Sequence, residues 1–466
     1  MSIYDSGIYK FLTGPLNDVA WLYILLPCVF VGGIYLTIGS GAVQFRRFGY
    51  AMKNTAGKLF TRQESAKGSV TPLQAVTTAL AATVGTGNIV GTSQAIAMGG
   101  YGAVFWLWIA ALLGMVIKYA EVTLAIQYRQ RDDHGDWVGG PMYYIENGMG
   151  PKWKWLAAVF SILAALAAFG IGNMSQSNSI VGSLNDAVTA LAPGFAGQKT
   201  LNWVIGILLA TLTGLVLFGG IKRIGAVTEK LIPFMSIAYI LMTLIVIFGD
   251  WRGILPAFGK IFSAAFTPRA VLGGAAGITL RQAVVWGLRR SAFSNEAGLG
   301  SAPIAHAAAH CKSPVDQGIY GIFEVFMDPI VICSLTALTI IISGVDITFG
   351  VKPGSSLITA AMSTVVSGKV SAVFVAVALS LFAYSTILGW SLYGTRCVQH
   401  LFGLKVARVY QMIFIIVIVV GCVSSLDFVW NIADTLNGLM AIPNFIALFA
   451  LSPVVFKLTK AYFKDK

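Results

Sequence analysis

Apolar residues recur along this chain in long runs that short polar segments separate. A crossing of the ~30 Å hydrocarbon core of a bilayer needs about 20 predominantly apolar residues in a helix, and eleven runs meet that length. They cover approximately residues 19–40, 71–98, 102–128, 153–191, 201–219, 228–249, 270–309, 318–343, 370–393, 406–423 and 428–457. The fourth and seventh runs exceed one crossing, so we expect each to be tilted, broken or extended beyond the bilayer. The pattern predicts an all-α polytopic membrane protein with about eleven transmembrane helices.

Composition narrows the function classes. The 466 residues are 56% hydrophobic and only 11% charged, whereas soluble domains carry about 25% charged residues. The +13 net charge is scattered over loops instead of forming a stripe, which indicates membrane topology and not a nucleic-acid partner. The five cysteines fit neither metal spacing nor a disulfide framework. Without a nucleophile motif or a metal-protease motif, the sequence predicts no enzyme and no organic cofactor.

Lysine and arginine counts predict the orientation. Of the 32 such residues, 21 fall on one side of the predicted topology, 7 on the other and 4 within spans. Because the richer side faces the cytoplasm, we expect the N-terminus outside and the C-terminus inside the cytoplasmic membrane. No feature of the pattern indicates an oligomeric state.

The order of the runs indicates an internal repeat within one transporter domain, 1–466. An additional first helix, 19–40, leaves ten spans, which divide into two sets of five at 71–249 and 270–457. Each set opens with a glycine-interrupted run, and the two runs are oppositely oriented. Discontinuous helices at matching positions of two inverted repeats are typical of secondary transporters with a site at the bilayer midplane. A channel is the less favoured alternative, because it needs a ring of selectivity elements.

The stretch Ala81–Gly91 is the first interruption. It holds three glycines, and glycine costs about 1 kcal/mol relative to alanine inside a helix; backbone groups freed within a bilayer must face protein or a water-filled cavity. We expect a break whose amide end suits a substrate carboxylate and whose carbonyl end, Ala81–Val84, suits sodium. The expected substrate-binding positions at the amide end are Gly85, Thr86, Gly87 and Asn88. The alternative is that small residues only permit close helix packing.

The seventh run offers two possible breaks, at Trp286–Gly287 and at Phe293–Gly300. Arg289 and Arg290 lie between them, and arginines at the bilayer centre are costly. We therefore predict the break near Trp286–Gly287 or slightly beyond it, with both arginines towards the inner face. Phe293 would then line the pocket.

Four motifs together resemble a known family. They are Ala81–Gly91, Gly139–Tyr143, Phe169–Gln176 and Phe293–Pro303, and they are similar to those of the alanine/glycine:cation symporters, also called sodium:alanine symporters. The resemblance covers nearly the whole chain. It implies the fold of the sodium-coupled leucine transporters with one additional helix at the start. It also implies import of alanine, glycine or similar small amino acids together with sodium, or alternatively with protons.

Several polar side chains then become candidate ligands. Asn173 and Gln176 lie three residues apart on one helical face, and their amides can meet both charged groups of an amino acid; the alternative is interhelical hydrogen bonding. The resemblance implies a sodium site formed by the main chain of Ala81 and Val84 with the hydroxyls of Ser385 and Thr386. Hard cations prefer such oxygen ligands, although Ser and Thr also bond back to their own helix. Thr83 and Asn88 form a weaker second sodium candidate.

The remaining membrane residues have less specific readings. Trp390 either caps the pocket and limits the substrate side chain or anchors its helix at the interface. Lys118 and Glu121 are three residues apart and are expected to pair. Asp328 or Glu296 would carry the proton if coupling were to H⁺. The four histidines are expected in loop or interfacial roles without a partner inside the membrane.

Overall fold

The computed structural model describes residues 7–58, 68–266, 279–424 and 426–464. These residues are mostly helical, which confirms the predicted class. Strands β1 (Gln130–Arg131) and β2 (Trp137–Val138) form one short antiparallel hairpin. The predicted seventh run begins with residues 270–278, which lie outside the described residues.

Eight helical stretches in the described part are long and apolar enough to cross a bilayer. They are Lys10–Gly39, Gly102–Gln127, Pro151–Leu191, Gln198–Leu217, Gly220–Gly249, Pro314–Ser343, Gly368–Val423 and Ile432–Tyr462. Runs 71–98 and 270–309 are absent from this set because each is broken into shorter pieces. Runs 370–393 and 406–423 share α20 (Gly368–Val423), whose helix is interrupted where Gly403 adopts φ 78°. The count of eleven crossings and the inverted repeat stay predictions.

The first described elements form the helical run predicted at 19–40 and the short helices that follow it. The elements are α1 (Gly7–Thr13), α2 (Pro15–Asp18), η2 (Val19–Leu25), α3 (Leu26–Gly39), α4 (Val43–Arg46), α5 (Phe48–Asn54) and η3 (Ala56–Lys58). The first broken run follows as α6 (Pro72–Thr83), η4 (Gly87–Gly91) and α7 (Thr92–Gly99).

The middle of the chain contains the long fourth run. This run is one uninterrupted helical stretch that includes a π-helical turn. The elements are α8 (Gly102–Gln127), α9 (Pro141–Tyr144), η5 (Ile145–Met149), η6 (Pro151–Trp153), α10 (Lys154–Phe169), η7 (Gly170–Met174), α11 (Ser175–Leu191), α12 (Gln198–Leu217), α13 (Gly220–Gly249), η8 (Trp251–Gly253) and α14 (Ile254–Phe266). The sequence pattern missed α14, because its length is below one crossing.

The last part of the chain carries the second broken run. The elements are α15 (Leu280–Asn295), α16 (Pro303–His306), α17 (Pro314–Val325), η9 (Phe326–Cys333), α18 (Ser334–Ser343), α19 (Ser356–Ser363), α20 and α21 (Leu426–Tyr462). Helix α19 lies between the predicted runs 318–343 and 370–393 and is too short for one crossing.

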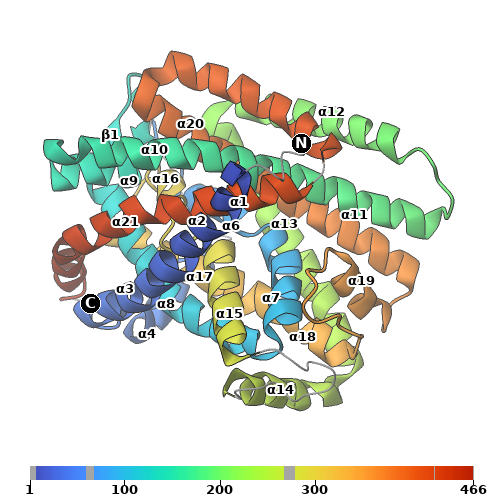
Figure 1. The fold of residues 1–466 in the computed structure, drawn as a ribbon. Coiled ribbons are helices and arrows are strands. Elements are labelled where there is room, and N and C mark those ends of the chain that lie inside the picture. Colours follow the sequence, from blue (N-terminus) through green and yellow to red (C-terminus); the bar gives the residue numbers. More distant parts are fainter. Residues whose placement is uncertain (1–6, 59–67, 267–278, 425, 465–466) are drawn as a thin grey trace.

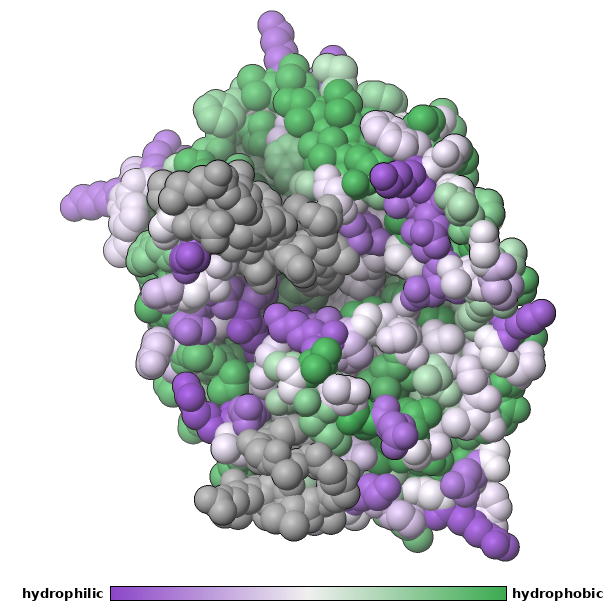
Figure 2. All heavy atoms as spheres, turned by 45° about the vertical axis from the view of Figure 1, so that its right-hand side comes forward, coloured by the Kyte–Doolittle hydropathy of each residue, from purple (hydrophilic) through white to green (hydrophobic). Residues whose placement is uncertain are grey.

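The helices pack into a bundle with two distinct ends (Figure 1). Hairpin strand β1, helix α4 and the C-terminus lie at one end, and α14 and α19 lie at the other. Large apolar side chains face outward along the bundle, as on Ile38 and Leu255, which are 75% and 82% exposed. On the face that carries the α19 end, hydrophilic residues gather across the middle while hydrophobic residues cover the top (Figure 2). This apolar exterior fits a protein surrounded by lipid.

Candidate functional site

The first break lies where the sequence predicts it. Helix α6 begins with a capping box between Thr71 and Gln74 and ends at Thr83; Val84 then leaves helical geometry with ψ 89°. The amide of Gly85 donates to Asn88 Oδ1 (2.9 Å) instead of to a helical carbonyl. The helix resumes as η4 at Gly87. The break therefore frees carbonyls at the end of α6 and folds the Asn88 side chain back over the gap.

Helix α20 lies directly against this break. Ser385 Oγ donates to Ala81 O (3.2 Å) and to Phe382 O (2.8 Å). Thr386 Oγ1 donates to Phe382 O (3.0 Å). A methyl group added at Gly85 would lie only 2.4 Å from Thr386 Oγ1. The hydroxyl pair therefore bonds back to its own helix and also faces the carbonyl end of α6. The hydrogen bonds back to α20 are the alternative named for this pair. The role as sodium ligands stays a prediction, which this geometry permits because a hydroxyl that donates to a carbonyl keeps lone pairs for a cation.

Asn88 connects the break to a buried carboxylate. Its Nδ2 donates to Asp328 Oδ1 on η9, and Ser294 Oγ of α15 donates to the same oxygen (3.0 Å). The other oxygen, Oδ2, is buried, and no described residue forms a hydrogen bond with it. Sequence reasoning did not connect Asp328 with the break. The available signal was an aspartate before a proline inside an apolar run.

Gln176 and Phe293 also meet the break. Gln176 Nε2 donates to Ile171 O (3.0 Å), a carbonyl of the π-helical turn η7. Its Oε1 is buried and lies 3.6 Å from the methyl position of Gly85. Within the part of the chain that the structure describes, this oxygen has no hydrogen-bond partner. The Phe293 ring comes within 3.4 Å of the methyl position of Gly87. These two side chains therefore line the gap from two other helices.

The other predicted ligands lie in less direct positions. Asn173 Nδ2 donates to Phe414 O (2.7 Å), which is the interhelical bond named as its alternative; its role as a substrate contact stays a prediction. Thr83 Oγ1 donates within its own helix, to Ala79 O (3.3 Å) and Leu80 O (3.4 Å). The side chain of Thr83 therefore does not share the contacts of Asn88, its proposed partner in a second sodium site. Thr86 Oγ1 is buried and has no hydrogen-bond partner among the described residues.

The second break differs from its predicted place. Helix α15 continues through Trp286 and Gly287 to Asn295, so the prediction at Trp286–Gly287 was wrong. The chain leaves helical geometry at Glu296, where φ is 56°, and again at Gly298 and Gly300, where φ is positive. Glycine is favoured at such positions because it has no Cβ. The other possible break, Phe293–Gly300, thus comes closer to the observed one.

Glu121 holds the second break. Its Oε1 accepts hydrogen bonds from the amides of Gly298 and Gly300 (both 3.1 Å) and from Nδ2 of Asn444 (2.6 Å). Trp390 Nε1 donates to Glu296 Oε1 (2.8 Å), so α20 contacts both breaks. The indole is 1% exposed, which excludes an anchor at the membrane interface.

The two arginines of α15 lie on the opposite side of the break from the predicted one. Arg290 lines a cavity together with Lys352. Arg289 pairs with Asp434, and its guanidinium lies 4.9 Å from the Trp21 ring centroid. The prediction treated the arginines as unpaired, whereas a carboxylate and aromatic faces offset their charge. Their place towards the inner face stays a prediction.

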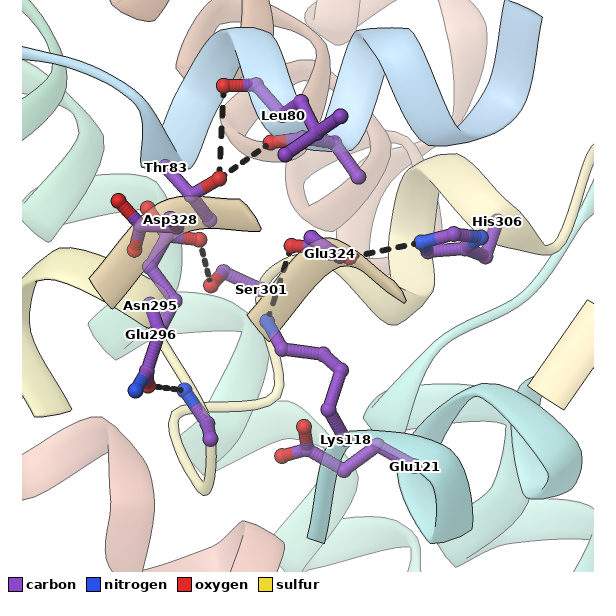
Figure 3. A network of polar contacts seen from close by, with 12 residues as sticks. Leu80, Thr83, Lys118, Glu121, Asn295, Glu296, Ser301, His306, Glu324 and Asp328 are labelled. Carbon is purple, nitrogen blue, oxygen red and sulfur yellow. Dashed lines mark hydrogen bonds and ion pairs between the residues drawn. The ribbon is translucent and has the colours of Figure 1, made fainter. Parts of the chain in front are cut away.

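The predicted pair Lys118–Glu121 is also absent, as Figure 3 shows. Lys118 Nζ instead lies 3.3 Å from Glu324 Oε1, with both side chains fully buried. His306 Nε2 lies 2.9 Å from the other oxygen of Glu324, and Gln317 Nε2 lies 2.8 Å from His306 Nδ1. His306 therefore has partners inside the protein, contrary to expectation. The three-residue spacing on α8 predicted Glu121 as the partner of Lys118. Glu121 instead accepts hydrogen bonds from the backbone of the second break.

A cavity of about 490 Å³ opens between the first break and the α19 end of the bundle. Val90, Ser179 and Leu379 line its wall. In the sequence they lie close to the site residues Asn88, Gln176 and Ser385, respectively. Arg290 and Lys352 supply positive charge, and Asp186 and Asp434 supply negative charge. A cavity with both signs of charge suits the approach of a zwitterion.

At the opposite end of the bundle, the loop residue Asp132 is an ionised carboxylate that contacts α20. Burial opposes ionisation of Asp132, but hydrogen bonds from Gln399 and the Asp136 amide and the charge of Arg396 outweigh it and lower its pKa. At neutral pH this loop therefore contributes a charged link to α20.

The sequence profile of the sodium:alanine symporter family matches residues 7–466. The chain belongs to this family. It is 43% identical over 97% of its length, and over 96% of the relative, to the sodium/alanine symporter AgcS of Methanococcus maripaludis. It is 36% identical to the "Probable sodium/glutamine symporter GlnT" of Bacillus subtilis, over 98% of the chain and 92% of the relative.

The fold is shared more widely than the sequence. The crystal structure of MhsT in complex with L-phenylalanine aligns with a TM-score of 0.60 at 15% identity, over 85% of this chain and 99% of MhsT. At that identity the likeness shows the fold alone. As a member of the sodium:alanine symporter family, the protein is an integral membrane transporter and not an enzyme, and the comparisons support sodium-coupled amino acid symport.

Proposed function

We propose that this sodium:alanine symporter family member imports alanine, glycine or similarly small neutral amino acids with sodium across the cytoplasmic membrane. The first break supports the proposal: one gap combines the carbonyl end of α6, the hydroxyls of Ser385 and Thr386, and a Gln176 oxygen with which no described residue forms a hydrogen bond. The name of one relative, which specifies alanine, also supports the substrate class. The name of the other, which specifies glutamine, supports a neutral amino acid with sodium but not small size.

The proposed roles follow the charges of a zwitterion and a cation. The backbone amides of the stretch Gly85–Asn88 meet the substrate carboxylate, and the Gly85 amide gives up its hydrogen bond to Asn88 Oδ1 when the substrate binds. Gln176 Oε1 accepts a hydrogen bond from the substrate ammonium group. Sodium binds the carbonyls of Ala81 and Val84 together with the two hydroxyls. Phe293 and Trp390 limit the substrate side chain. Alternating access with the N-terminus outside and the C-terminus inside completes the proposal.

Sodium and alanine should bind with positive linkage, because the cation stabilises the same break that receives the substrate. Isothermal titration of alanine into the purified protein is expected to give about a tenfold or greater affinity gain when sodium replaces choline. Thermodynamic reciprocity requires alanine to raise sodium affinity by the same factor. Equal alanine affinity in sodium and choline would overturn sodium coupling.

Replacing Gln176 with alanine is expected to weaken alanine binding by about tenfold. The variant loses one hydrogen bond to a charged group, which contributes about 1.5–3 kcal/mol. Titration in saturating sodium measures the change. Asn185→Ala is the control, because Asn185 lies further along α11 and bonds Asn202 (3.0 Å). An unchanged affinity in Gln176→Ala would remove this residue from the site.

Proton coupling is the second candidate, and one observation favours it. Asp328 is fully buried and contacts the break through Asn88, and among the residues that the structure describes one of its oxygens has no hydrogen-bond partner. Uptake into proteoliposomes under separate sodium and pH gradients distinguishes the two couplings. Accumulation driven by the pH gradient alone would favour Asp328 as a proton carrier.

A further inference from the structure

A second cavity lies outside the transport pathway, where α3 and α21 end together. Its volume is about 650 Å³. Its lining residues are Gly39, Ser40, Gly41, Val43, Arg46, Arg47, Phe456, Lys457, Thr459, Lys460, Phe463 and Lys464. Helix α4 and the C-terminus lie side by side at this end of the bundle (Figure 1).

The depth of this cavity is set by the ends of two apolar helices. Gly39 ends the first candidate span and Tyr462 ends the last one, so the cavity lies at the boundary between hydrocarbon and water. A methyl group added at Gly39 would lie 2.0 Å from the Phe456 ring, so the missing side chain lets this ring pack against α3. Beside it, Ile38 and Phe45 are 75% and 52% exposed. The rim therefore continues into a surface that suits acyl chains.

Five of the residues that line the cavity are cations, and the lining contains no acidic residue. Arg46 Nη1 reaches Gly41 O (3.4 Å), and the guanidinium of Arg47 lies 4.8 Å from the Phe463 ring centroid. Helix C-termini favour nearby cations, and cytoplasmic loops carry many. Those two rules account for the number of positive charges here. They do not account for the convergence of the charges on one hollow with largely apolar walls.

We propose that this cavity binds the headgroup of an anionic phospholipid, with its acyl chains along the exposed apolar side chains of α3 and α4. Basic pockets between membrane helices on the cytoplasmic side suit such headgroups. The shared chemistry is that of a phosphate anion, and the boundary position favours the lipid over a soluble phosphate. The proposal does not depend on the transported substrate.

The test measures phosphatidylglycerol retained by the full-length protein in nanodiscs of equal phosphatidylglycerol and phosphatidylcholine content, by native mass spectrometry. The cavity variant is Arg46→Gln/Lys457→Gln/Lys460→Gln. The matched control, Lys222→Gln/Arg223→Gln/Lys230→Gln, removes the same charge from exposed residues of α13. A charge-conserving variant, Lys457→Arg/Lys460→Arg, shows whether lost binding follows from lost charge.

Phosphatidylglycerol is expected to bind the cavity variant about a hundredfold more weakly, since each cation near an anionic headgroup contributes about fivefold. The control and the charge-conserving variant should retain the lipid. Equal retention by the wild type and the cavity variant would overturn the proposal, as would equal loss in the control. Displacement of phosphatidylglycerol by millimolar inorganic phosphate would assign the cavity to a soluble anion instead.

Discussion

Gly85→Ala is expected to lower amino acid uptake at least a hundredfold while the protein still folds. The added methyl group would lie 2.4 Å from Thr386 Oγ1, well inside van der Waals contact. Either the Thr386 hydroxyl rotates away from the gap or α6 moves away from α20. Overpacking of this kind costs about 1–3 kcal/mol, and both responses separate the carbonyl end of α6 from the hydroxyl pair. Initial rates of alanine uptake into proteoliposomes measure the effect.

Two further variants separate a local clash from general damage. Gly49→Ala in α5 is the matched control, because nothing lies within 4 Å of its methyl position, and we expect normal uptake. In Gly85→Ala/Thr386→Ala the clash is relieved, so thermal stability should recover while sodium dependence does not. Recovery of both in the double variant would mean that Thr386 takes no part in ion binding. Normal uptake in Gly85→Ala alone would contradict the site assignment.

The first break could be predicted because its signal is local. Glycines at 85, 87 and 91 weaken a helix wherever they occur, and apolar residues on both sides fix their depth. Asn88 stands within the same few residues, and its side chain does fold over the gap. Local chain geometry therefore carried this part of the prediction without any knowledge of the neighbouring helices.

The second break was misplaced because its decisive residues lie far apart in the sequence. The loop after Asn295 is held by Glu121 of α8 and Asn444 of α21, and neither contact has a sequence signal near the loop. The arginines of α15 were predicted away from the bilayer centre because unpaired arginines are costly there, but Asp434 faces Arg289. Charges inside a bundle are paired across helices, and pairing across helices depends on tertiary packing.

Lys118→Met is expected to destabilise the protein by about 3–5 kcal/mol, because it leaves Glu324 as a buried, uncompensated carboxylate beside His306. Lys118 and Glu324 are both fully buried, and their charged atoms lie 3.3 Å apart. The apparent free energy of unfolding in mixed detergent micelles measures the loss. Lys154→Met removes the lysine of the exposed pair with Glu146 (2.9 Å) and is expected to cost less than about 1 kcal/mol.

A double-mutant cycle decides which carboxylate is the partner of Lys118. Combining Lys118→Met with Glu324→Gln should recover much of the lost stability, because both charges leave the interior together, with a coupling of about 2–3 kcal/mol. Combining Lys118→Met with Glu121→Gln should give a smaller coupling, since Glu121 accepts the amides of Gly298 and Gly300 instead of a lysine proton. A larger coupling with Glu121 would restore the pairing that helix spacing suggests and contradict the geometry between α8 and α17. The coupling energy with Glu324 should be the larger one because the two carboxylates have different roles. Glu324 neutralises a buried cation, whereas Glu121 accepts hydrogen bonds from the backbone of the second break.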